Sequence, residues 1–274
     1  MEIKVADVAK LRKMTGAGMM DCKNALTEAG GDFDRAQEII REKGKLVAAK
    51  RADRETTEGA VIARVTDDKK KGIVAAVGCE TDFVSKNDDF KALANTVADL
   101  ASTAFPPDKD SLMNLKSGQF TIAELIAAQT GKSGEKHVVA FYDKIEGEYL
   151  SWYIHMNNKL ATVAAFDKVI DEQAGRNIAM QITAMNPVSI SREDCPRSII
   201  EKESELAREA ARQEGRPENM IEKIAEGKLA KFFKENTLNE QTFIKDGKIS
   251  VDEYLKSVDK DVKVTGFVRF SLND

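Results

Sequence analysis

Two short apolar runs in the chain align with each other without a gap, and this repeat constrains the fold more than any other feature. The first run, G-I-V-A-A-V, covers residues 72–77, and the second, A-T-V-A-A-F, covers residues 161–166. Each follows another β-rich run and precedes a segment with helical spacing of apolar residues. The repeat therefore predicts two related α+β subdomains, although a match of this length between unrelated strands also arises by chance.

Each subdomain is expected to contain a three-stranded antiparallel sheet backed by a helix, because a third β-rich run closes each copy. The first subdomain covers residues 59–145 and the second covers residues 146–274. The expected elements of the first copy are strands at residues 60–65, 73–77 and 138–142 and a helix at residues 88–101. Those of the second copy are strands at residues 149–154, 161–166 and 262–270 and a helix at residues 171–185.

Each copy carries an insert before its last strand. In the first insert, Thr121 and Glu124 form a capping box that opens a short helix ending near Gly131. The second insert, at about residues 191–235, contains two charged helices separated by E-G-R-P. Because each helix has only a narrow apolar stripe, we expect an antiparallel coiled-coil hairpin that protrudes from the body.

Residues 1–45 predict a three-helix module that resembles a ubiquitin-associated (UBA) domain. A glycine is expected to end each helix: Gly16 the first, Gly30 the second and Gly44 the third. The charged residues 46–58 that follow are interpreted as a linker or a fraying helix. The residues at helical spacing on the expected inward face of the first helix are Val5, Val8, Leu11 and Met14.

The charge balance argues against a bulk nucleic-acid binder. The chain of 274 residues has 42 basic and 46 acidic residues, a net charge of -4 and a pI near 5.5, whereas such binders carry a basic excess. Lys50, Arg51 and Arg54 are interpreted as a solvated charged face, with contact to RNA or to an acidic partner as the alternative. No direct contact with nucleic acid is expected.

Cysteine usage and the N-terminus indicate a cytoplasmic protein without a membrane segment. Cys22, Cys79 and Cys195 lie far apart, and no C-x-x-C spacing suggests a zinc site or a disulfide framework. The first residues lack the apolar core of a signal peptide, and no run approaches the ~18 apolar residues of a membrane span. Neither a metal nor another cofactor is expected.

The sequence offers little for acid/base or nucleophilic catalysis, so an enzyme is not expected. His137 and His155 are the two histidines, and no P-loop, G-x-S-x-G or dinucleotide glycine pattern occurs. His137 begins a β-rich run and is interpreted as structural. His155 ends another such run.

An aromatic residue interrupts the polar segment between the second strand and the first long helix. This segment, C-E-T-D-F-V-S-K-N-D-D-F at residues 79–90, contains the turn formers that the exit of a strand requires. Phe83 and Val84 break the polar pattern, and such side chains either pack back onto the core or are held out for a partner. Spacing alone favours packing of Phe83 onto the core.

Two methionines follow a glycine turn between the first two predicted helices, in G-A-G-M-M at residues 16–20. Adjacent side chains at a helix start point in different directions, so at least one of Met19 and Met20 is expected to be exposed. An adaptable contact surface and simple core filling explain the pair equally well.

Three motifs, spread from residue 15 to residue 270, occur together in this chain. They are T-G-A-G-M-M-D-C-K at residues 15–23, T-D-F-V at residues 81–84 and V-T-G-F-V-R-F at residues 264–270. Each motif alone is weak, but the set is specific. In this order the motifs resemble those of the bacterial translation elongation factor Ts family, which implies the same protruding coiled-coil hairpin.

The resemblance implies a guanine-nucleotide exchange factor that binds elongation factor Tu with GDP and promotes GDP release during translation elongation. Thr81, Asp82, Phe83 and Val84 match the exchange loop of the family. Phe83 is then expected to wedge beside the phosphate and magnesium region of the GTPase, because an aromatic ring displaces much volume. Asp82 is expected to help hold the loop.

The resemblance also implies a docking surface on the N-terminal module. Met19, Met20 and Arg12 match the positions through which the family contacts its GTPase. His155 matches a histidine near the partner, but the turn M-N-N-K that follows departs from the glycine-containing turn of the family, so a contact role and its absence are equally compatible with the resemblance. The alternative function is a UBA-type adaptor without exchange activity, which leaves T-D-F-V unexplained.

Overall fold

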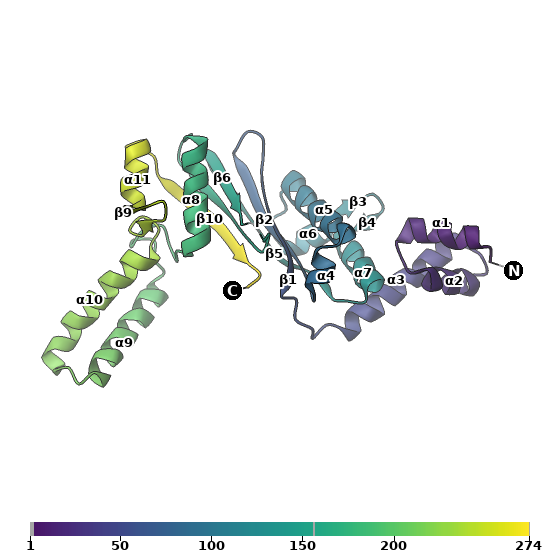
Figure 1. Cartoon of the computed structure of the whole chain (residues 1–274), viewed down its shortest axis with the longest axis horizontal. Helices are drawn as coiled ribbons and strands as arrows, with labels where there is room; N and C mark the ends of the chain where they lie inside the picture. The colour runs from purple at the N-terminus through teal and green to yellow at the C-terminus, as the bar shows by residue number, and fades with distance from the viewer. Residues whose placement is uncertain (1–2, 156, 274) are drawn as a thin grey trace.

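The computed structural model describes residues 3–155 and 157–273, and Figure 1 shows an elongated molecule with three N-terminal helices at one end and a helical hairpin at the other. The N-terminal helices are α1 (Val5–Thr15), α2 (Met19–Glu28) and α3 (Phe33–Lys50). They enclose a small core of their own, in which Leu11 and Leu26 are fully buried. The prediction of three helices in this region is confirmed.

The middle of the chain forms two three-stranded antiparallel sheets with the same topology. The central strands, β2 and β7, contain the two runs that align in sequence, so the predicted repeat corresponds to equivalent strands. In spatial order the strands are β1 (Glu58–Val65), β2 (Lys71–Cys79) and β5 (His137–Glu146) in the first sheet, and β10 (Val264–Ser271), β7 (Leu160–Phe166) and β6 (Tyr149–Ile154) in the second.

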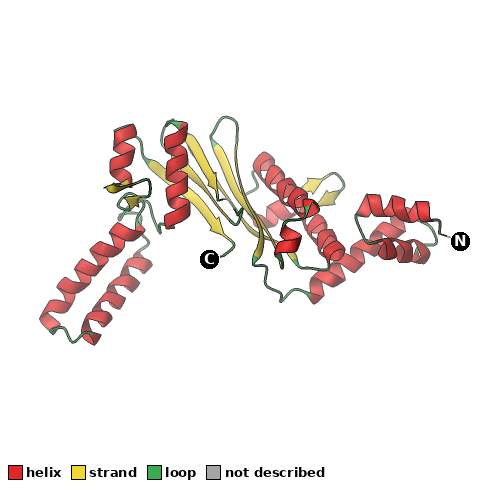
Figure 2. Cartoon of the chain, viewed as in Figure 1, coloured by secondary structure: helices red, strands yellow, loops and turns green. Residues whose placement is uncertain are grey.

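The two sheets pack face to face, and a helix covers the outer face of each (Figure 2). These helices are α5 (Asp88–Ala104) on the first sheet and α8 (Glu172–Met185) on the second. Val74 and Ala76 of β2 pack against the second sheet, whereas Ile73 of the same strand packs on the α5 side. Strand β2 is therefore buried on both faces, which explains its continuous apolar sequence.

The first insert opens with short elements and ends with a capped helix. The Thr121 N–H donates to Oε2 of Glu124 at 2.9 Å, and the Glu124 N–H donates to Oγ1 of Thr121 at 3.2 Å. These two bonds confirm the predicted capping box. The elements of the insert are α6 (Lys109–Met113), β3 (Lys116–Ser117), β4 (Phe120–Thr121) and α7 (Ile122–Ser133).

The second insert forms an antiparallel pair of helices that projects from the second subdomain (Figure 1). These are α9 (Arg197–Gln213) and α10 (Glu218–Asn236), and ion pairs such as Arg208 Nε to Glu222 Oε1 at 2.9 Å join them. Among the described residues, no helix is both long and apolar enough to cross a membrane. Three elements after the hairpin were not predicted: β8 (Thr242–Phe243), β9 (Asp246–Ser250) and α11 (Val251–Val258).

Helix α3 continues through Gly44 to Lys50, so the predicted helix end at this glycine is wrong. Helix α3 crosses α7 at this point, and a Cβ on Gly44 would lie 2.8 Å from the carbonyl oxygen of Ala127. A glycine is needed here because the two helix backbones approach closely, not because the helix stops. The first five residues of segment 46–58, which was interpreted as a linker or a fraying helix, are helical and belong to α3.

Helix α1 buries a narrower face than the sequence predicts. Val8 and Leu11 are buried as expected, but Val5 and Met14 are exposed. Each step of three residues moves about 60° around a helix with 3.6 residues per turn, so residues nine apart lie on opposite sides. The two middle residues of the stripe therefore face the core and the two outer ones do not.

Candidate functional site

Phe83, which was predicted to lie in a loop, lies on a one-turn helix, α4 (Asp82–Ser85), which connects β2 to α5. Phe83 is 84% exposed, whereas Val84 is partly buried against the core of the first subdomain. The expectation from spacing alone, that Phe83 packs onto the core, is therefore wrong. Adjacent side chains on a helix point about 100° apart, so Val84 anchors the turn while Phe83 points away from the core.

Thr81 caps this turn and attaches it to the rest of the subdomain. Its hydroxyl oxygen accepts from the Val84 N–H at 3.4 Å, and the same hydroxyl donates to Oε1 of Glu135 at 2.7 Å. The Thr81 N–H donates to Oε2 of the same carboxylate at 3.1 Å. Both oxygens of Glu135 thus hold the residue that caps α4.

Asp82 forms an ion pair within the turn itself. Its Oδ2 lies 2.6 Å from Nζ of Lys86, and both side chains reach solvent. The hydrogen bond from Lys86 lowers the pKa of Asp82. Ion pairs of this exposed kind contribute little to stability. The polar attachment of the turn to the rest of the subdomain therefore comes from Glu135, while Asp82 pairs only inside the turn.

Glu80, which precedes the turn, joins three segments of the chain. Both of its carboxylate oxygens lie 2.8 Å from Nη1 of Arg51, and Oε1 also accepts from the backbone N–H of Lys136 at 2.6 Å. The backbone hydrogen bond from Lys136, followed by that from Arg51, lowers the pKa of Glu80. Arg51, interpreted above as part of a solvated face, in fact anchors the end of α3 to the base of the turn.

Cys79 and His137 form the last pair of the β2–β5 ladder next to the turn. The Cys79 thiol donates to the carbonyl oxygen of Thr81 at 3.3 Å, and burial raises its pKa to about 12. Burial also lowers the pKa of His137, whose Nδ1 lies 2.9 Å from the carbonyl oxygen of Glu135. A thiol that stays protonated is a poor nucleophile, so this pair supports the turn and does not supply chemistry.

The glycine turn near the N-terminus presents both methionines to solvent. Gly16 has a φ of 70°, a left-handed conformation that ends α1. Met19 is 41% exposed and Met20 is 65% exposed. The prediction that at least one of them is exposed is therefore confirmed, and core filling does not explain the pair.

A surface hollow places Met19 beside the start of α5. Arg12 and Met19 line it from the N-terminal module, and Asp89 and Lys132 line it from α5 and α7. Asp89 and Lys132 also form an ion pair with each other. The structure thus brings the methionine turn next to the helix that begins just after the exposed aromatic of α4.

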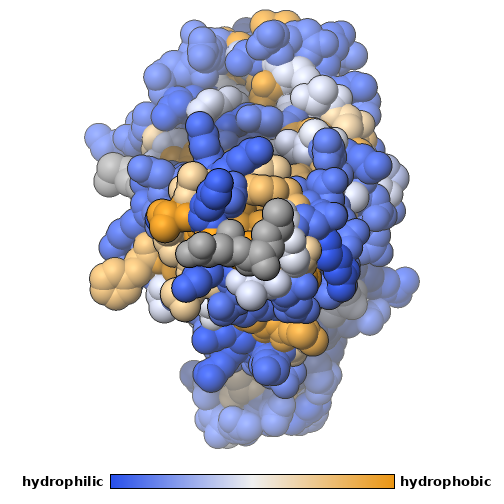
Figure 3. Space-filling model, turned by 90° about the vertical axis from the view of Figure 1, so that its right-hand side faces the viewer, coloured by the Kyte–Doolittle hydropathy of each residue, from blue (hydrophilic) through white to orange (hydrophobic). Residues whose placement is uncertain are grey.

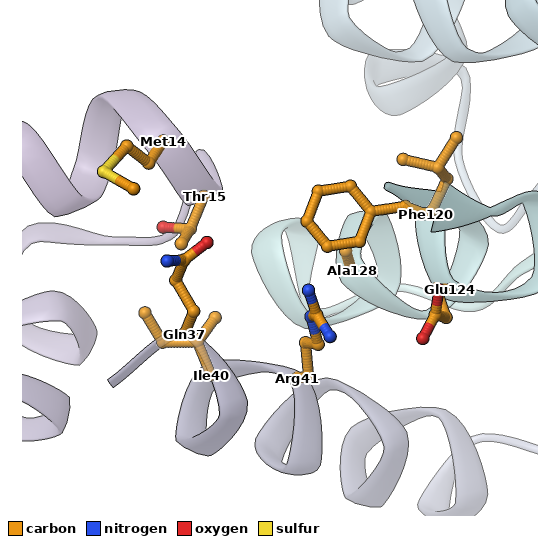
Figure 4. A pocket seen from close by; sticks show the side chains of 9 residues that line it. Met14, Thr15, Gln37, Ile40, Arg41, Phe120, Glu124 and Ala128 are labelled. Atoms are coloured by element: carbon orange, nitrogen blue, oxygen red, sulfur yellow. The ribbon is translucent and has the colours of Figure 1, made fainter. Parts of the chain in front are cut away.

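A separate cavity of about 110 Å³ lies where α1 and α3 meet the first insert (Figure 4). The guanidinium of Arg41 on α3 lies 4.4 Å from the ring centroid of Phe120, and Met14 and Ile40 contribute to the apolar lining. Apolar patches are visible among hydrophilic side chains at this end of the molecule (Figure 3). The described lining of the cavity contains none of the predicted site residues.

His155 lies exposed just beyond β6. Its backbone N–H donates to the carbonyl oxygen of Leu160 at 2.9 Å, and its ring lies 6.3 Å from that of Tyr153. Within the described part of the chain, no hydrogen bond or ion pair joins His155 to α4 or to the methionine turn. Met156, part of the predicted M-N-N-K turn, lies outside the described residues.

The described residues, 3–155 and 157–273, contain no cluster of metal ligands. No group of three or more His, Cys, Asp or Glu side chains there has an arrangement that could hold a metal. The exposed large apolar side chains of these residues include Phe83 on α4 and Met19 and Met20 at the start of α2, each next to a hydrogen-bonded turn. Such features suit the binding of another protein.

Known proteins match the chain over nearly its whole length. A family model described as elongation factor TS matches residues 80–274. The protein named elongation factor Ts from Christiangramia forsetii is 46% identical over 273 residues, which cover 99% of this chain and 99% of that protein. The chain belongs to the elongation factor Ts family.

Other curated relatives named elongation factor Ts match to a similar degree. The Porphyromonas gingivalis protein is 47% identical over 274 residues, which cover 100% of this chain and 99% of the relative. The Flavobacterium psychrophilum protein is 48% identical over 272 residues, which cover 98% of each. The resemblance inferred from three short motifs is thereby confirmed along the whole sequence.

In this member of the elongation factor Ts family, the sequence marks the turn at residues 81–84 but not the residues that hold it. Glu80 is adjacent to the motif, yet its partner Arg51 lies 29 residues earlier. Glu135 lies 54 residues after Thr81, in a polar stretch between a helix and a strand. A carboxylate in such a stretch has no local pattern that distinguishes it from a solvated one.

Proposed function

We propose that this chain is a guanine-nucleotide exchange factor, which binds elongation factor Tu with GDP and promotes GDP release during translation elongation. Membership of the elongation factor Ts family supports this function. The structural observation that carries the proposal is Phe83, an exposed aromatic on a short turn that is tied to a rigid sheet.

Such a factor changes an equilibrium and makes or breaks no covalent bond. It must bind the nucleotide-free GTPase more tightly than the GDP-bound form. By thermodynamic linkage it then lowers the affinity for GDP by the same factor. A coupling free energy of about 1.4 kcal/mol corresponds to a tenfold change in affinity. Exchange of this kind requires no catalytic residue, so the chain is proposed not to be an enzyme.

Phe83 is proposed to enter the GTPase beside its phosphate and magnesium region. A phenylalanine has only two side-chain torsions, so it loses little conformational entropy when it is ordered in a complex. Thr81 caps the turn, Asp82 pairs within it and Val84 packs on the core. These three residues then present Phe83 and limit its movement.

The N-terminal helices are proposed to form a UBA-like module that docks on the same partner. Met19 and Met20 supply a flexible apolar surface, and Arg12 lies in the adjoining hollow. Helix α3 extends beyond this module to Arg51 at the base of α4. Helix α3 would therefore connect the docking surface of the N-terminal module with the turn that carries the inserted Phe83.

The rest of the architecture is proposed to follow the same family. The module at residues 1–45 precedes two subdomains at residues 59–145 and 146–274, and α9 with α10 forms a coiled-coil appendage of the second. His155, exposed beyond β6, is a further candidate contact. The protein is proposed to act in the cytoplasm on elongation factor Tu, without binding nucleic acid or membranes directly.

Release of a fluorescent GDP analogue from elongation factor Tu in a stopped-flow instrument tests the proposed function. The chain should accelerate release in a concentration-dependent manner, with saturation as the complex forms. The control is an equal concentration of the chain unfolded by heat and cooled. A release rate that stays at the intrinsic value at every concentration of folded chain would contradict the proposal.

A further inference from the structure

We infer that Glu135 is a positioning residue, which orients the turn carrying Phe83 without touching the partner. This inference rests on the proposed exchange function. Two hydrogen bonds carry it: the Glu135 carboxylate accepts from the Thr81 N–H at 3.1 Å and from the Thr81 hydroxyl at 2.7 Å. Glu135 stands outside the T-D-F-V motif and comes from the segment between α7 and β5.

Glu80 and Glu135 extend the contact between β2 and β5 beyond the last strand pair. Glu80, which follows β2, accepts from the backbone N–H of Lys136 at 2.6 Å. Glu135, which precedes β5, accepts from the backbone N–H of Thr81. Each carboxylate thus accepts a hydrogen bond from the backbone of the opposite segment.

The turn depends on this attachment because it has little stability of its own. Helix α4 contains a single turn, and isolated helices of this length do not form in water. Phe83 projects into solvent and adds no packing, so Val84 supplies the apolar contact with the core. The Thr81 hydroxyl, which bonds both Val84 N–H and Glu135, fixes the N-cap of the helix.

The backbone that carries Glu135 is itself well fixed. Gly134, with a φ of 74°, ends α7, and the Glu135 N–H donates to the Ser133 hydroxyl oxygen at 3.0 Å. His137 follows directly in β5 and is buried. A carboxylate on this support has a defined position, so the side chain transmits the rigidity of the sheet to α4.

Orientation of Phe83 in the free protein reduces the entropy lost on binding, which is the general effect of preorganisation. A misplaced wedge still allows docking through the methionine turn, but it disturbs the nucleotide site less effectively. Loss of Glu135 should therefore lower the maximal rate of GDP release more than the affinity of the complex.

A double-mutant cycle with Glu135→Ala and Phe83→Ala tests the inference. In the wild-type background, Glu135→Ala should reduce the maximal rate of GDP release by roughly ten- to a hundredfold. In the Phe83→Ala background, the same change should alter the rate by less than about twofold, because the residue to be oriented is gone. Equal losses in the two backgrounds would overturn the assignment.

Glu124→Ala is the matched control, because Glu124 also accepts a hydrogen bond from a threonine N–H and lies at the other end of α7. Its removal should lower stability as the loss of a cap does, with GDP release unchanged. Glu135→Gln retains one acceptor oxygen and should recover part of the rate. A loss with Glu124→Ala equal to that with Glu135→Ala would indicate a general structural effect and overturn the inference.

Amide hydrogen exchange of the isolated protein tests the orientation of the turn without any partner. Glu135→Ala should speed exchange in residues 82–86 by roughly tenfold and leave β7 protected. Unchanged exchange in residues 82–86 would overturn the role of Glu135. If the wild-type chain fails to accelerate GDP release, the proposed function fails, and this measurement decides separately whether Glu135 holds the turn.

Discussion

Gly44 of α3 lies against Gly131 of α7, so closely that a Cβ on Gly131 would come within 2.8 Å of the Cα atom of Gly44. Helix α3 contributes buried Ala36 to the N-terminal core before this crossing and leads to Arg51, the partner of Glu80, after it. The crossing therefore fixes the helix that connects the methionine turn to the base of α4.

We expect Gly44→Ala to lower the free energy of unfolding by about 1–3 kcal/mol, because the added methyl group meets a backbone carbonyl that cannot move freely. Alanine favours a helix by only ~1 kcal/mol over glycine, which does not offset this clash. Thermal and urea unfolding followed by circular dichroism measure the change.

Gly227→Ala on α10 is the matched control for Gly44→Ala. A Cβ there would meet no described atom within 4 Å, so the helix preference of alanine acts alone. This variant should gain up to ~1 kcal/mol. A gain of stability in both variants would show that α3 and α7 do not cross at Gly44 as described.

Local patterns were sufficient to predict most helices and strands of this fold. The capping box of Thr121 and Glu124 involves residues three apart, and the continuous apolar run that marks β2 involves neighbouring residues. The same local evidence misassigned Gly44, because a glycine in a helical pattern fits a helix end and a close helix crossing equally well. Only the presence of α7 on the other side decides between them.

The candidate site could be predicted in part. The motif T-D-F-V identified the segment that carries the exposed aromatic. Spacing alone favoured packing of Phe83 onto the core, because the identity of an apolar residue does not indicate which way its side chain points. Helical rotation by one residue separates Phe83 from Val84, and this rotation depends on the Thr81 cap. Glu135 was missed because its hydrogen bonds to Thr81 span 54 residues.

His137 should make the stability of the protein depend on pH. Burial lowers its pKa in the folded state below the ordinary value near 6.5, so between the two values the unfolded chain binds more protons than the folded one. The stability contributed by neutral His137 is thus fully present above pH ~6.5 and is lost as pH falls below it. Nearby Glu135 and Glu80 oppose this shift, and burial outweighs them.

Urea unfolding at several pH values between 5 and 7.5 measures this dependence. His137→Gln removes the titrating group and should flatten the dependence in this range. The lowered pKa of Glu80 places its titration below this range, so it does not obscure the effect. His155→Gln, a change at an exposed histidine, serves as the control and should preserve the wild-type slope. An unchanged slope in His137→Gln would contradict the assignment.

Met19→Ser with Met20→Ser should weaken binding to elongation factor Tu by roughly ten- to thirtyfold, since exposed side chains that become buried in an interface contribute ~2 kcal/mol. Calorimetry with the nucleotide-free GTPase measures the affinity. The melting temperature should remain near that of wild type, because neither methionine belongs to the buried core of the module.

Met220→Ser provides the control for the methionine pair. Met220 on α10 is 47% exposed, comparable to Met19, and lies on the hairpin rather than on the N-terminal module. Its replacement should leave the affinity unchanged. Equal weakening by Met220→Ser, or no weakening by the Met19 and Met20 changes, would place the docking surface elsewhere.

Phe83→Ala tests whether Phe83 acts by insertion into the GTPase and not in docking or in folding. Because Phe83 is 84% exposed, its truncation should leave the melting temperature nearly unchanged, whereas truncation of a core phenylalanine costs about 3–5 kcal/mol. The maximal rate of GDP release should fall by one to three orders of magnitude, the range of ~1.5–4 kcal/mol for loss of an aromatic anchor.

Phe90→Ala is the contrasting variant, since Phe90 is fully buried in the core next to the same turn. It should lower the melting temperature first and affect exchange only through the fraction of folded protein. Phe83→Ala should give the reverse pair of results, normal melting with slow GDP release. A Phe83→Ala protein that melts early, or that releases GDP at the wild-type rate, would show that Phe83 does not act as the inserted residue.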